Sequence, residues 1–229
     1  MSIVRQDLVI IGASASSEIL GLIDDINAVQ LRYRVIGILD DDPQWHDQSI
    51  EGTPVLGLLS MVKTFPSVQF IFGIASFKNR LVRHKILQDL GIPKNRFETL
   101  VHPTAYVHSS AVLGHGVIVF PQSMISKGVQ IGDFCQIVSS KIGFECHIYE
   151  GAIVSFDTRL TARVQVKPYA YIGMGSTITL PISVGVGVLV GAASLVLEDL
   201  SDGGVYMGNP LKLMRRDSLL PELEGAFYG

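Results

Sequence analysis

The sequence between Ala105 and Leu200 repeats aliphatic residues with a period of six, and this repeat constrains the fold more than any other feature. The period is interrupted once, by a five-residue step from Ile137 to Ile142. The sixteen aliphatic positions are Val107, Leu113, Val119, Ile125, Ile131, Ile137, Ile142, Ile148, Val154, Leu160, Val166, Ile172, Ile178, Val184, Val190 and Val196. Chance alternation does not hold one period over so long a stretch, so the repeat predicts a solenoid of stacked coils.

The residue two places before most of these positions is small, as at Ala152, Ala170 and Ser176. Residues two apart on a strand share a face, so both side chains point inward and predict a narrow parallel β-helix. A glycine often follows the aliphatic residue, as at Gly173 and Gly191. We interpret these glycines as corner residues with backbone angles that other residues avoid.

The first hundred residues alternate apolar strand-like runs with helical patterns. We expect strands at 8–12, 35–39, 68–75 and 97–101 and helices at 18–26, 56–63 and 78–90. Continuous Val, Ile and Leu runs are typical of buried parallel strands, so they predict a small α/β domain. Proline suits a junction, and His102-Pro103 divides the chain into domains at 1–102 and 103–204 and a tail at 205–229.

Composition excludes several classes of partner. The net charge of −3 and the absence of a Lys/Arg run give no basic field for nucleic acid or a membrane surface. The start of the chain lacks a signal-peptide pattern, and the apolar stretch 183–197 is broken by Gly and Ser, so we expect a cytoplasmic protein. Cys135 and Cys146 lack metal-ligand spacing, and no metal is expected. There is no glycine fingerprint of a redox dinucleotide site.

The hexapeptide repeat resembles that of the left-handed β-helix acyltransferases, which usually assemble as trimers. The whole chain resembles the subfamily of sialic acid O-acetyltransferases and nucleotide-linked amino-sugar N-acetyltransferases of the bacillosamine and perosamine type. Besides the repeat, the matching segments are 8–13, 35–42, 100–105 and 205–210. The resemblance implies an α/β Rossmann-like domain followed by a left-handed parallel β-helix. It also implies acetyl-CoA as cosubstrate, a homotrimer, and a nucleotide-linked amino sugar of surface glycan biosynthesis, such as lipopolysaccharide O-antigen, as acceptor.

In that subfamily the turn after the first strand supplies backbone N–H groups to the nucleotide sugar. The resemblance therefore implies substrate contacts from Gly12, Ser14, Ala15 and Ser16. Exposed N–H groups at a helix start favour anions. A plain strand-to-helix turn, capped by Ser16 or Ser17, is the structural alternative.

Two acidic residues, Asp40 and Asp41, end the second strand. A carboxylate there can accept hydrogen bonds from a ribose or base, and the resemblance implies that role for both. The alternative is a solvated acidic turn, which Asp42-Pro43 suits. Ala75 takes the position of a family glycine near the substrate.

The acyl donor is expected along the β-helix between subunits. By resemblance, the contacting residues are Ile153, Gly173, Met174, Gly191, Ala192, Asn209 and Pro210. Packing alone also explains most of these residues, because the repeat requires them. The basic residues Lys212, Arg215 and Arg216 are candidates to pair with CoA phosphates.

The resembled family carries its catalytic base in a corner written His-Glu/Asp-Cys, and here that corner reads Gly143-Phe-Glu-Cys146. With the missing residue placed before Ile142, Phe144 takes the histidine position and Glu145 that of its acidic partner. With the gap placed after Glu145, this carboxylate takes the histidine position, but Gly143 then fills an aliphatic slot. In both alignments Glu145 is the catalytic candidate, and burial against Phe144 and a neighbouring subunit would make it a stronger base.

Three other histidines are weaker candidates: His147 points outward from a flat face, His115 falls on a different corner, and His102 is structural. Acyl transfer without an enzymic base is also open, because positioning alone supplies much of the acceleration. Two other functions are a sugar O-acetyltransferase and a catalytically silent homologue that binds a nucleotide sugar. The replacement of histidine by Phe144 favours the silent homologue over O-acetylation.

Overall fold

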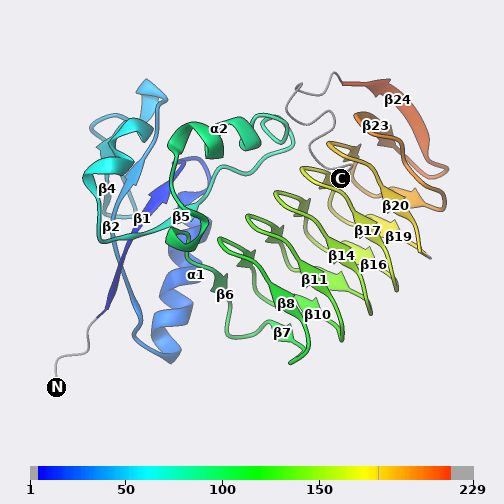
Figure 1. Ribbon diagram of the computed structural model, residues 1–229, viewed down its shortest axis with the longest axis horizontal. Coiled ribbons are helices and arrows are strands. Elements are labelled where there is room, and N and C mark those ends of the chain that lie inside the picture. The colour runs from blue at the N-terminus through cyan, green and yellow to red at the C-terminus, as the bar shows by residue number, and fades with distance from the viewer. Residues whose placement is uncertain (1–4, 180, 218–229) are drawn as a thin grey trace.

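The computed structural model describes residues 5–179 and 181–217, and it contains an α/β domain beside a solenoid (Figure 1). The α/β domain has a five-stranded sheet in the order β3-β4-β2-β1-β5, parallel except at β3. Its strands are β1 (Gln6–Ile11), β2 (Tyr33–Leu39), β3 (Ser49–Ile50), β4 (Thr53–Gly57) and β5 (Gln69–Phe72). Its helices are α1 (Ser16–Val29), α2 (Arg83–Leu90) and the 3-10 turns η1 (Pro43–Trp45), η2 (Leu59–Thr64) and η3 (Lys94–Arg96).

Both faces of this sheet are covered. Helix α1 buries Ile19, Ile23 and Ile26 against one face, at the spacing of three and four that aligns residues on one side of a helix. Val62 of η2 and Leu90 of α2 cover the other face. The expected parallel α/β domain is therefore confirmed.

Two of the expected helices differ from the structure. The segment 56–63 was expected to be helical, but Val55 pairs with Ile38 and the chain continues as β4 to Gly57 before the short η2. Strand pairing with a buried neighbour outweighs the local helical pattern. The helix expected from Lys78 begins only at Arg83, because the side chain of Asn79 bonds the backbone of Ser76 and holds a turn.

The solenoid has three flat faces, which we name A, B and C. Face A contains β7 (Tyr106–Val107), β10 (Met124–Ile125), β13 (Lys141–Ile142), β16 (Arg159–Leu160), β19 (Thr177–Ile178) and β22 (Leu195–Val196). Face B contains β8 (Val112–Leu113), β11 (Gln130–Ile131), β14 (His147–Ile148), β17 (Gln165–Val166) and β20 (Ser183–Val184). Face C contains β6 (Leu100–Val101), β9 (Ile118–Val119), β12 (Gln136–Ile137), β15 (Ile153–Val154), β18 (Tyr171–Ile172), β21 (Leu189–Val190), β23 (Gly204–Met207) and the antiparallel β24 (Lys212–Arg216).

The chain runs A, B, C in every coil, so three corners repeat along the solenoid. Corner AB includes Phe144 and Glu145, corner BC includes Glu150 and Gly151, and corner CA includes Met174. The repeated aliphatic residues form one continuous core, in which only Val107 and Leu113 are partly buried. The predicted left-handed β-helix is confirmed.

The five-residue step removes one residue from corner CA. Strand β12 ends at Ile137 and β13 begins at Lys141, while Ile142 pairs with Ile125 on one side and Leu160 on the other. The missing residue therefore lies before Ile142. The alternative alignment, with the gap after Glu145, is wrong, because Ile142 is fully buried in the aliphatic position.

The glycines that follow the aliphatic residues have a different role from the expected one. A Cβ atom on Gly173 would lie 2.7 Å from the backbone N of Ala192 in the next coil. These glycines are required because successive coils lie too close together for a Cβ atom, and not because of a positive φ. Positive φ occurs at the corners, as at Gly128 and Gly151.

The α/β domain packs on face C. Leu100 and Ile118 belong to the same apolar cluster as α1, and Gln136 Nε2 donates to the carbonyl of Phe72 at 3.4 Å. Face C begins at Leu100, before the expected boundary at 102, and continues through β23 after 204. His102 is buried and bonds Asp25 at 3.0 Å, which gives it a structural role.

Candidate active site

The catalytic candidate lies at an exposed corner. Strands β13 and β14 hold Phe144 and Glu145 at corner AB, where Phe144 is 60% exposed. Glu145 Oε2 accepts a hydrogen bond from Arg163 Nε at 2.7 Å, and the two side chains are 58% and 69% exposed. The burial that would strengthen Glu145 as a base is not provided by this chain alone.

His147 lies next to this corner but projects from face B. Its ring stacks on Tyr149 with centroids 3.8 Å apart, and Lys167 Nζ lies 4.5 Å from the Tyr149 centroid. Burial, and then the charge of Lys167, lower the pKa of His147 below its ordinary 6.5. The imidazole is therefore neutral at pH 7.

The predicted substrate turn lies against the segment after β5. Gly12 has a φ of 99°, and a Cβ there would lie 2.6 Å from Cγ1 of Ile74, the neighbour of Ala75. Ser14 is exposed, but Ser16 is buried and donates its hydroxyl to the Gly12 carbonyl at 2.8 Å. Helix α1 has no side-chain cap, so the alternative of a cap by Ser16 or Ser17 is wrong.

The two predicted carboxylates already bind backbone N–H groups. Asp40 Oδ2 accepts from Ala13 N at 2.7 Å, and its Oδ1 accepts from Asp42 N at 2.8 Å. Asp41 Oδ1 accepts from Leu59 N at 2.8 Å, and Asp41 also lines a pocket of about 290 Å³. Asp40 therefore holds the shape of the turn, whereas Asp41 faces an open volume.

Most of the predicted cofactor residues gather at corner CA. Met174 is 54% exposed, and Ala192 occupies the same corner of the next coil. Ser194 Oγ accepts from Gly208 N at 3.1 Å, which brings the exposed Asn209 and Pro210 to this corner. In the basic cluster, Arg215 bonds Asp217 and Arg216 bonds the Asp202 carbonyl, while Lys212 is exposed. The expected tail also includes 218–229, which lies outside the described residues.

Ile153 differs from the other cofactor predictions because it is only 3% exposed. It points outward from face C between Gln136 and Tyr171, which are its partners in register. Both neighbours contact the α/β domain, Gln136 at Phe72 and Tyr171 at Phe77. Ile153 therefore lies beneath that domain.

The structure brings some predicted residues together and separates others. The substrate turn and Ala75 follow β1 and β5 at the carboxyl edge of the sheet, and the predicted cofactor residues other than Ile153 lie at corner CA, along the border of face C. Phe144 and Glu145 lie at corner AB, on the opposite side of the triangular solenoid. One chain does not place Glu145 beside the other predicted residues.

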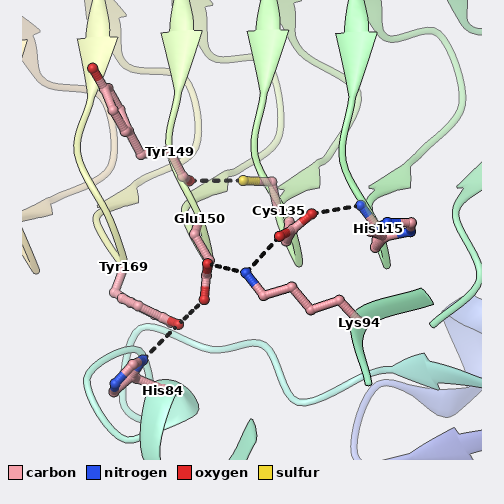
Figure 2. Close-up of polar contacts among 8 residues, drawn as sticks. His84, Lys94, His115, Cys135, Tyr149, Glu150 and Tyr169 are labelled. Atoms are coloured by element: carbon pink, nitrogen blue, oxygen red, sulfur yellow. Dashed lines mark hydrogen bonds and ion pairs between the residues drawn. The ribbon is translucent and has the colours of Figure 1, made fainter. Parts of the chain in front are cut away.

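A polar network at corner BC was not predicted (Figure 2). Lys94 Nζ bonds Asp133 at 2.7 Å and Glu150 at 2.9 Å, and the Tyr169 hydroxyl donates to Glu150 at 2.9 Å. His84 of α2 lies 3.1 Å from the same hydroxyl, and a pocket of about 390 Å³ borders Lys94 and Glu150. Burial raises the pKa of Tyr169. Asp133 and Glu150 both fall at corner BC, which the repeat predicts. The position of Lys94 beside them depends on how the α/β domain packs on the solenoid.

The two cysteine thiols are free and buried. Burial raises the pKa of Cys135 to about 12 and that of Cys146 to about 11, so both are unreactive thiols at pH 7. Within 5–179 and 181–217, no group of three His, Cys, Asp or Glu side chains is arranged to hold a metal ion. None of the helices described is long and apolar enough to span a bilayer.

Comparison with known proteins found similarity in the α/β domain and in the solenoid. Residues 7–90 match the PglD N-terminal domain. GDP-perosamine N-acetyltransferase of Escherichia coli O157:H7 is 25% identical over 175 residues, which cover 74% of this chain and 78% of the relative. The bifunctional protein GlmU of Lactococcus lactis is 30% identical over 114 residues, but these cover 47% of this chain and only 25% of that longer protein.

Two solved structures share the whole architecture. The acetyltransferase domain of PglB from Neisseria gonorrhoeae, in complex with acetyl coenzyme A, has a TM-score of 0.79 at 22% identity, and the match covers 92% of this chain and 100% of that one. A histidine-to-asparagine mutant of perosamine N-acetyltransferase from Caulobacter crescentus, in complex with CoA and GDP-perosamine, has a TM-score of 0.77 at 25% identity, covering 94% and 100%.

The fold and the repeat define a two-domain hexapeptide-repeat protein, with an α/β domain packed on a left-handed β-helix. Over both domains the chain is similar to hexapeptide-repeat sugar N-acetyltransferases.

Proposed function

We propose that this chain is an acetyl-CoA-dependent N-acetyltransferase that acts on the amino group of a nucleotide-linked amino sugar. The observation that carries the proposal is the match to a perosamine N-acetyltransferase over both domains, with CoA and GDP-perosamine bound in that relative. The accessible turn at Ser14 and the exposed corner at Met174 and Ala192 support separate acceptor and donor sites.

The reaction joins the sugar nitrogen to the acetyl carbon and releases CoA as a thiol. The amine must lose its proton before or during attack, and a base near the acceptor assists this step. Phe144 cannot accept a proton, so the chain depends more on holding the amine close to the thioester, which supplies about 7 kcal/mol or more in well-oriented reactions. Glu145 is the candidate base, and it acts only where a second subunit covers corner AB.

The separation of corner AB from face C supports a trimer in which a partner's Glu145 completes the site. Light scattering on a size-exclusion column should then give a mass three times that of the chain. Mixing two inactive variants, one changed at Glu145 and one at Ser14, should restore part of the activity. A monomer that transfers acetyl groups would contradict this assembly. We also place the reaction in the cytoplasm, where acetyl-CoA and nucleotide sugars for surface glycans are made.

Thiol release tests the function directly. The protein is incubated with acetyl-CoA and a panel of UDP-, GDP- and dTDP-linked amino sugars, and free CoA is measured. Release above background, with one acceptor preferred, is the expected result. The replacement of histidine by Phe144 specifically favours a second candidate, a silent homologue that binds nucleotide sugar, and no release with any acceptor would select it.

A substitution of Glu145 tests the catalytic role. Glu145→Gln should lower kcat by about 100-fold, the lower range for a general base, and should change the pH–rate profile. Asp24→Asn, on the exposed side of α1, is the control and should leave the rate unchanged. An unaltered profile in Glu145→Gln would remove this residue from the mechanism.

A further inference from the structure

Arg83, the first residue of α2, is a fully buried cation at the junction of the two domains. Its hydrogen bonds within the described chain go to backbone carbonyl oxygens. Nε donates to Ile74 and Nη2 to Phe134, each at 2.8 Å, and Nη1 donates to Gly151. Burial lowers the pKa of Arg83 to about 10, so the guanidinium remains charged at pH 7.

The three carbonyls belong to different parts of the molecule. Ile74 precedes Ala75 and packs against Gly12, so it lies in the predicted acceptor site. Phe134 and Gly151 lie at corner BC in two successive coils of the solenoid. A guanidinium is a rigid planar fork, so binding all three fixes the acceptor segment relative to the coils.

A second arginine holds the same segment. Arg80 donates to the carbonyl of Gly187 at corner BC at 3.2 Å and to that of Phe77 at 2.9 Å. The Phe77 ring packs edge-on against Tyr171 of face C, with centroids 6.2 Å apart. The segment 73–83 is therefore attached to the solenoid along its length.

We propose that Arg83 is a positioning residue for acyl transfer, which sets the distance between the acceptor held beside Ile74 and the donor held on the solenoid. This inference rests on the proposed N-acetyltransferase function. Arg83 lies away from the reacting atoms and acts through the backbone of Ile74. In a reaction without a histidine base, a misplacement of about 1 Å costs up to about 100-fold in rate.

The test replaces the fork and keeps the charge. In Arg83→Lys a single ammonium cannot span the three carbonyls, so kcat should fall by about 10- to 100-fold, while KM for acetyl-CoA and for the acceptor change much less. The matched control is Arg96→Lys. Arg96 lies 5.3 Å from the Phe70 ring, as Arg83 does from Phe72, but it donates to Phe65 and Val68 within the α/β domain. The Arg96→Lys variant should lose stability and keep the wild-type kcat.

Hydrogen exchange provides a measurement that needs no turnover. Amides of 73–82 should exchange faster in Arg83→Lys than in the wild-type protein, and not in Arg96→Lys. If the wild-type protein transfers no acetyl group, the proposed function fails, and exchange alone decides whether Arg83 holds the segment. Three results would overturn the proposal: an unchanged kcat in Arg83→Lys, an equal loss of kcat in Arg83→Lys and Arg96→Lys, or unchanged hydrogen exchange in Arg83→Lys. Arg83→Gln is the second variant, and if neither folds, Arg83 is a folding residue and the positioning role is rejected.

Discussion

Corners AB and BC belong to the same coil and have the same strand–turn–strand geometry, but their surroundings differ. At corner AB, Glu145 and Arg163 form an ion pair that is mostly exposed. At corner BC, Glu150, five residues after Glu145, bonds both Lys94 and Tyr169, and the Gly151 carbonyl accepts from Arg83. One corner is open and the other is covered by the α/β domain.

The repeat determines the position of each corner but not what the corner contacts. The six-residue period sets where corners occur and which side chains enter the core. What each corner contacts depends on the element packed against it, which here is α2 and the segment around Lys94. The carboxylate of Glu150 at corner BC therefore stabilises the domain interface, while that of Glu145 at corner AB is accessible to a ligand or a second subunit.

The largest difference is expected for glycine substitutions at the two corners. Gly151→Ala places a Cβ against the buried Tyr169 ring at a φ of 69°, so it should destabilise by about 3 kcal/mol through overpacking and strain. At the open corner, Gly128→Ala has a similar φ of 72°, but the nearest atom to its Cβ would be Glu145 Cγ at 3.3 Å, so a loss of about 1 kcal/mol is expected. Thermal unfolding of both variants measures the difference, and equal losses would show that φ alone decides the cost.

An intermediate effect is expected from restoring a histidine at the open corner. Phe144→His places an imidazole where Phe144 is now 60% exposed, and it should raise kcat by about tenfold, a modest part of what a general base contributes. The gain should appear as pH rises through the pKa of the new imidazole. His115→Phe at corner BC is the control and should leave kcat unchanged. A Phe144→His protein that is no faster would mean that proton transfer does not limit the reaction.

The smallest effects are expected from the ion pairs, and acid should distinguish them. Burial acts to raise the pKa of Asp133, but hydrogen bonds from Lys94 and His115 outweigh it and hold the pKa below 3.8. Stability from this pair is therefore present above about pH 4 and is lost as pH falls through the pKa of the folded state. Lys94→Met should cost about 1 kcal/mol at pH 7 and progressively less below pH 4, whereas Arg163→Met should cost less than about 0.5 kcal/mol. Urea unfolding at pH 7 and below pH 4 measures the free energy of unfolding of each variant. A cost of Lys94→Met that does not depend on pH would exclude the Asp133 pair as its source.

The sequence predicted the parts of the structure that depend on local periodicity. The solenoid core, the parallel sheet and the position of Phe144 at the corner follow from residue spacing, and the structure confirms them. Strand β4 was missed because its pairing with β2 is a tertiary contact. Arg83 and Lys94 were missed because each binds partners 39 to 68 residues away in the chain. Roles of the predicted site residues stay predictions, since they depend on ligands and a second subunit.

The shortened corner between Ile137 and Lys141 bears on how this protein can vary in length. A deletion within a strand would move the following core side chains to the solvent face, because side chains alternate between the two faces along a strand. At this corner the chain loses one residue, and β13 still pairs in register with β10 and β16. Natural insertions and deletions in such solenoids should therefore accumulate at corners. An engineer who wishes to add a loop to this protein should begin there.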